Sequence, residues 1–122
     1  MLKEFHIWFA ILTTAVVLIA TSEGVLRAIR GTPAGVAAIR THWAVLISVV
    51  VTAVAGVALL ISGERPKEWL HLLYAGLAFG LIPFADEAAT SLRTNRAKGL
   101  YRFGGGITCL LVLTRLFLTG QN

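Results

Sequence analysis

Four long apolar runs, separated by short polar connectors, constrain this chain more than any other feature. The runs cover residues 5–25, 42–62, 69–89 and 100–119. Each approaches or exceeds the roughly 20 apolar residues that cross about 30 Å of hydrocarbon. Because backbone N–H and C=O groups in lipid must be satisfied within their own segment, each run is predicted to be a helix. The sequence therefore predicts an all-α fold, with residues 1–122 forming one domain in which four transmembrane helices make an up-down bundle.

The composition supports a membrane protein. Hydrophobic residues make up 57% of the chain and charged residues only 14%, whereas soluble domains carry about 25% charge. The first run follows Lys3 and has some features of a signal peptide, but we interpret it as a retained span. The net charge of +5 does not indicate nucleic-acid binding, since the basic residues lie in the connectors, where they set topology and contact lipid headgroups.

The distribution of Lys and Arg predicts the orientation of the bundle. The side that carries the termini and the second connector holds Lys3, Arg65 and Lys67. The first and third connectors hold seven basic residues: Arg27, Arg30, Arg40, Arg93, Arg96, Lys98 and Arg102. By the positive-inside rule we expect these two connectors in the cytoplasm and both termini outside, in a bacterial inner membrane.

Three polar residues are predicted to meet near the outer side of the spans: His6, His71 and Arg115. Two neutral imidazoles on different helices can supply both axial ligands of a b-type haem, and an arginine can pair with its propionates. This cluster is therefore a candidate haem site. The alternative is that the histidines sit at headgroup level and Arg115 extends to the membrane surface.

A second polar cluster is predicted near the inner side, where His42, Asp86 and Glu87 accompany Glu23 among the basic residues of the connectors. We favour interfacial ion pairs that anchor the bundle, since paired charges are the least unfavourable arrangement there. The alternative is a proton or quinone site, because an acid and a histidine can exchange protons with a bound quinol.

Small residues four positions apart predict close helix packing. The pairs are Thr52 and Gly56 in the second run, and Gly76 and Gly80 in the third. The alternative is that such residues are simply common in membrane helices.

The motifs of several enzyme classes do not occur in the sequence. It contains no Gly-rich phosphate loop, HExxH, GxSxG or paired CxxC, and Cys109 is the single cysteine. We therefore expect neither a stand-alone enzyme nor a metal site other than haem iron.

Two stretches carry a resemblance to other proteins. EWLHLLYAGLAFGLIPFADEA (68–88) and TRLFLTG (114–120) resemble small four-span bacterial membrane proteins. Across all four spans, the chain is also similar in architecture to haem-binding four-helix membrane bundles, such as the halves of haem A synthase. The second resemblance implies haem ligation by histidines.

These features predict a small accessory subunit of a larger bacterial membrane complex in electron transport, with haem b as the candidate cofactor. Its partners would be membrane lipids and other integral membrane subunits, rather than nucleic acid or a soluble small-molecule substrate. Two alternatives remain: a homo-oligomeric transporter or channel, and a quinone- or haem-binding membrane protein that acts alone.

Overall fold

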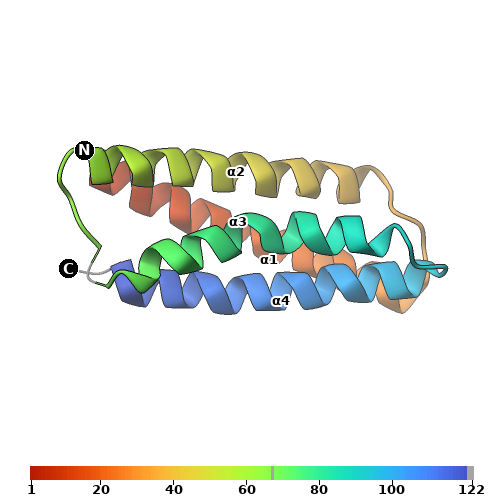
Figure 1. The fold of residues 1–122 in the computed structure, drawn as a ribbon. Helices are drawn as coiled ribbons and strands as arrows, with labels where there is room; N and C mark the ends of the chain where they lie inside the picture. The colour runs from red at the N-terminus through yellow and green to blue at the C-terminus, as the bar shows by residue number, and fades with distance from the viewer. Residues whose placement is uncertain (67, 121–122) are drawn as a thin grey trace.

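The computed structural model describes residues 1–66 and 68–120 and folds them into four α-helices (Figure 1). These are α1 (Leu2–Arg30), α2 (Val36–Ile61), α3 (Leu70–Ala89) and α4 (Asn95–Gly120). Each helix is long and apolar enough to cross a membrane. The predicted all-α bundle of four membrane-span helices is confirmed.

The helices run past the predicted apolar limits mainly at one end of the bundle. α1 continues to Arg30 and α4 begins at Asn95, so their polar turns are still helical. Gly31 ends α1 in the left-handed conformation (φ 66°), and its N–H donates to the carbonyl of Arg27 at 2.8 Å. Gly63 follows α2 with φ 98°. Glycine takes this backbone conformation without the steric penalty of a side chain, so both connectors can turn sharply.

The chain runs up and down through the bundle. Figure 1 shows both termini and the α2–α3 connector at one end, which we call the outer end. The α1–α2 and α3–α4 connectors lie at the opposite, inner end. α1 packs closely against α2 and α4, and α3 packs closely against α4. α2 and α3 touch much less, so the bundle has one weakly packed seam.

The bundle interior is filled between the two ends. Val17, Val45, Ile82 and Cys109 have at most 1% of their surface exposed. Large apolar side chains also cover the outside, including Trp8, which is more than half exposed. An apolar outer surface of this kind suits lipid as the surrounding solvent.

Glycines of α4 allow its close contacts with α1. A Cβ on Gly99 would lie 2.6 Å from the nitrogen of Ala28 and 2.7 Å from the oxygen of Gly24. Gly106, by contrast, faces the side chain of Thr21. The α1–α4 interface therefore has backbone-to-backbone contact, as expected where small residues meet in membrane helices.

The predicted packing pairs differ in their outcome. Gly56 lies against the ring of His6, and Thr52 bonds to α1 through its hydroxyl, at 3.1 Å from that of Thr13. A Cβ on Gly76 or Gly80, in contrast, would meet nothing within 4 Å. These two glycines therefore bring no helices together within the described part of this chain. The reason is that α3 packs through its inner alanine face, where Ala78 and Ala85 are buried, and turns the glycines away from it.

Candidate functional site

Two histidines from opposite corners of the bundle face each other near the outer end. His6 belongs to α1 and His71 to α3. Their ring centroids are 6.4 Å apart and their planes are inclined by 65°. Both side chains are partly buried. The predicted pairing of these residues is therefore present in the structure.

Each imidazole is oriented by a backbone carbonyl on a neighbouring helix. His6 Nδ1 lies 3.0 Å from the oxygen of Thr52 on α2, and His71 Nδ1 lies 3.0 Å from the oxygen of Leu116 on α4. A carbonyl oxygen only accepts hydrogen bonds, so both Nδ1 atoms carry the hydrogen and donate it. Each neutral ring then keeps its lone pair on Nε2. No hydrogen bond to either Nε2 occurs among residues 1–66 and 68–120.

Glycines leave the space that the two rings occupy. A Cβ on Gly56 would lie 3.1 Å from Cε1 of His6, and a Cβ on Gly120 would lie 2.7 Å from Cε1 of His71. An alanine at either place would push the adjacent imidazole away from its position. Gly120 was not among the residues singled out from the sequence, because nothing in its local pattern points to a histidine 49 positions earlier.

The separation of the two rings is close to that of two imidazoles that ligate one iron. A metal–imidazole bond of about 2 Å on each side, plus roughly 1 Å from nitrogen to ring centre, separates two such centroids by about 6 Å. Within the described residues, no group of three or more His, Cys, Asp and Glu side chains could hold a metal ion. Two protein ligands suffice only where other donors complete the coordination, as the four pyrrole nitrogens of haem do.

Arg115 does not join the two histidines. Its side chain is exposed on α4, on the same outward face as Leu111 and Leu118. Within the described residues it makes no ion pair. The suggested pairing of Arg115 with haem propionates therefore stays a prediction without a contact in its favour.

Arg102 is the centre of the inner cluster. Its side chain has 2% of its surface exposed, and its guanidinium bonds to all three other helices. It donates to Glu23 of α1 at 2.7 Å and to the hydroxyl of Thr41 and the carbonyl of Ala38 on α2 at 2.7 and 3.0 Å. It also donates to both carboxylate oxygens of Asp86 on α3, at 3.0 and 2.7 Å. This side chain therefore joins four helices at one point.

Two further residues extend this network. Arg27 forms an ion pair with Glu23 one turn earlier on α1 through its Nε, which lies 2.5 Å from Oε1 but is not aligned for a hydrogen bond. His42 lies with Nδ1 2.6 Å from Oδ2 of Asp86. With a neutral His42, two carboxylates balance two guanidinium groups, which is the arrangement that makes buried charge tolerable.

The inner candidates divide into two groups. His42 and Asp86 belong to the network, whereas the side chain of Glu87 is exposed. Arg102 had appeared in the sequence only as one of the basic connector residues. The signal that could have distinguished it is its place about two turns inside α4, beyond the polar residues that begin that helix.

No known protein family, no curated protein and no solved structure matches this chain.

Proposed function

We propose that this chain is a membrane-embedded haem b protein that serves as a small electron-transfer subunit of a larger membrane complex. The observation that supports this most is the pair of imidazoles of His6 and His71, whose free Nε2 lone pairs belong to rings at the separation that two axial ligands require. The chain is also small. Gly76 and Gly80 on α3 contact no other helix within the described residues, so this face is free to contact another protein.

His6 and His71 would hold the haem, which would supply one-electron transfer when bound. The residues of this chain set the conditions for that exchange. The Nδ1–H bonds to the carbonyls of Thr52 and Leu116 fix the orientation of both rings and increase the basicity of Nε2. Because the two carbonyls belong to α2 and α4, all four helices share in holding the ligand pair.

The interior below the histidines separates the candidate haem from the inner end. Directly inward of His6, Thr13 and Thr52 bond to each other, and Val17 and Cys109 fill the space beyond them. These groups keep water away from the inner face of the site. Under the predicted topology, the haem would lie near the outer surface of the membrane and exchange electrons with a partner there.

An optical spectrum of the purified protein tests this proposal. The chain is produced with haem supply, solubilised gently and measured before and after dithionite addition. We expect a Soret band, and α and β bands that sharpen on reduction, with about one haem per chain. Replacing His6 or His71 with alanine should remove the six-coordinate spectrum, whereas Arg115→Gln should keep it.

A flat spectrum after haem supplementation would contradict the haem assignment. The subunit assignment needs a separate readout: the chain should travel with unlike membrane proteins on native gels of mildly solubilised membranes. A homo-oligomer that conducts a solute in liposomes would instead favour the transporter alternative.

A further inference from the structure

The α2–α3 seam contains a hydrogen-bond acceptor that haem ligation does not use. Asp86 accepts two hydrogen bonds from the guanidinium of Arg102 and therefore is held as the carboxylate. The ring of His42 donates its Nδ1–H to this carboxylate at 2.6 Å. In the neutral form of the ring, this bond leaves the lone pair on Nε2. The side chain of His42 is 28% exposed, so the ring is accessible from outside the bundle.

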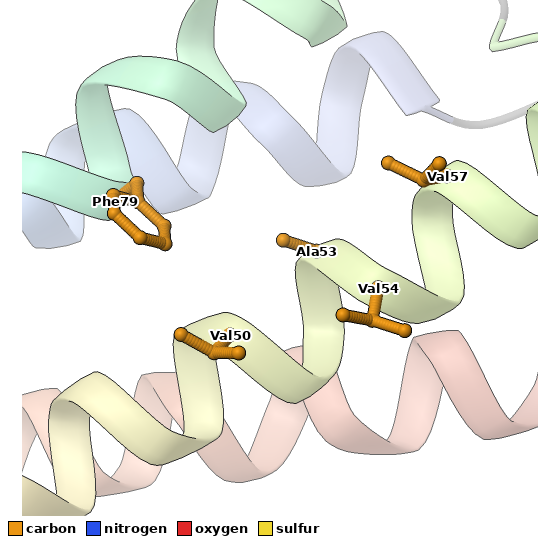
Figure 2. Close-up of a pocket in the computed structure, with 5 residues that line it drawn as sticks. All are labelled: Val50, Ala53, Val54, Val57 and Phe79. Carbon is orange, nitrogen blue, oxygen red and sulfur yellow. The ribbon is translucent and has the colours of Figure 1, made fainter.

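An apolar groove lies along the same seam. Figure 2 shows Val50, Ala53, Val54 and Val57 of α2, with Phe79 of α3 on the other side of the groove. His42 and Ala53 are eleven residues apart, about three helical turns, and so share one face of α2. Asp86 and Phe79 are seven residues apart, about two turns, on one face of α3. The polar group therefore lies on the inner side of the groove, on the same faces of α2 and α3.

We propose that this seam binds a membrane-soluble hydroquinone. Its ring hydroxyl donates a hydrogen bond to Nε2 of His42, and its hydrocarbon tail lies along the groove that Ala53 and Phe79 line. The weak packing between α2 and α3 lets such a molecule enter sideways from the lipid. This inference does not rest on the haem proposal, because it uses different residues.

The chemistry of the acceptor selects this ligand class over the membrane's other amphipathic molecules. The phosphate group of a phospholipid offers only acceptor oxygens and negative charge, and the carboxylate of Asp86 directly behind the ring repels it. An oxidised quinone likewise offers only carbonyl acceptors. A phenolic hydroxyl is a donor that can bond to a neutral imidazole. With the neutral ring, the reduced, dihydroxy form therefore fits Nε2 better than the oxidised form or a phosphate group does.

Trp43 provides a local readout of binding. Its ring lies beside His42, with centroids 5.8 Å apart and planes at 90°. The chain has three tryptophans, and the other two are the exposed Trp8 and Trp69. The double substitution Trp8→Phe and Trp69→Phe in the full chain leaves Trp43 as the single emitter. This protein, in lipid nanodiscs, is titrated with a decyl-substituted hydroquinone and with the dimethyl ether of the same molecule.

We expect a saturable change in Trp43 emission, with the hydroquinone binding about three- to tenfold more tightly than its ether, the range that one net hydrogen bond provides. His42→Phe should reduce this ratio to about one. Ala53→Phe, which fills the groove, should weaken both ligands, while Ala15→Phe on an exposed position of α1 and Glu87→Gln should leave both affinities unchanged.

Equal binding of the hydroquinone and its ether to the parent protein would overturn the proposal and identify the seam as a plain lipid groove. An unchanged preference in folded His42→Phe would overturn it too. The comparison of the two ligands needs no variant at His42, so it stays decisive even if that variant fails to fold. It also needs no haem, so its failure is distinguishable from failure of the haem assignment.

Discussion

Replacing Arg102 with methionine should destabilise the bundle more than the loss of any other single charged side chain. Arg102 is 2% exposed and holds the carboxylates of Glu23 and Asp86, which are themselves only 13% and 19% exposed. Methionine removes the cation but leaves both anions in place. Breaking a buried ion pair by removing one partner costs about 3–5 kcal/mol, because the remaining charge is uncompensated.

The assay is equilibrium unfolding in mixed detergent and SDS micelles, followed by the loss of helical circular dichroism. Arg93→Met is the matched control, since Arg93 is exposed in the α3–α4 connector and should change the free energy of unfolding by less than about 0.5 kcal/mol. Adding Asp86→Asn to Arg102→Met should recover part of the loss, because Asp86 is then no longer an unpaired charge, while Glu23 keeps its ion pair with Arg27. An Arg102→Met protein within about 1 kcal/mol of the parent would refute the reasoning.

Three other changes test separate parts of the account. Gly99→Ala should lower the free energy of unfolding by about 1–3 kcal/mol through overpacking. The control Gly104→Ala places its Cβ in open space and should be neutral or stabilising. Equal effects of the two substitutions in SDS unfolding would contradict the α1–α4 contact. Cys109 has no exposed surface, so a maleimide should label it only after SDS unfolding, and rapid labelling of the folded protein would place it outside the core. Gly120→Ala should reduce haem content per chain, measured by pyridine haemochrome, because its Cβ would lie 2.7 Å from the ring of His71; full haem content would argue against that ring position.

Hydropathy predicted the elements of the fold well because the bilayer imposes a length and a composition on every span. The helical limits differ mainly at the inner end, where polar turns such as Arg27–Arg30 and Asn95–Lys98 stay helical beyond the apolar runs. Hydropathy assigns such turns to connectors, although helix hydrogen bonding does not end where hydrocarbon does.

The glycine contacts show what spacing alone cannot decide. Gly76 and Gly80 have the small-xxx-small spacing but face open space, whereas a Cβ on Gly24 or Gly99 would meet backbone atoms of the facing helix. The spacing tells which residues share a helix face, but not which face meets a neighbour. On α1 the recurrence of Ala20, Gly24 and Ala28 every fourth residue was a signal that could have been used.

The two polar clusters were also predictable only in part. Alternating helix directions placed His6 near His71 and His42 near Asp86, because depth in the membrane follows from position in each span. The orientation of side chains around each helix does not follow from depth. For that reason Arg115 and Glu87, which were grouped with these residues by depth, lie exposed on outward faces.

The central claim is that the imidazoles of His6 and His71 ligate one haem iron. Low-temperature electron paramagnetic resonance of the oxidised, haem-supplied protein tests it most directly. The account predicts a low-spin ferric signal in the parent protein, and its replacement by a high-spin signal or loss of haem in both His6→Ala and His71→Ala. A low-spin signal that survives in either variant, or a parent protein that holds no haem, would contradict it.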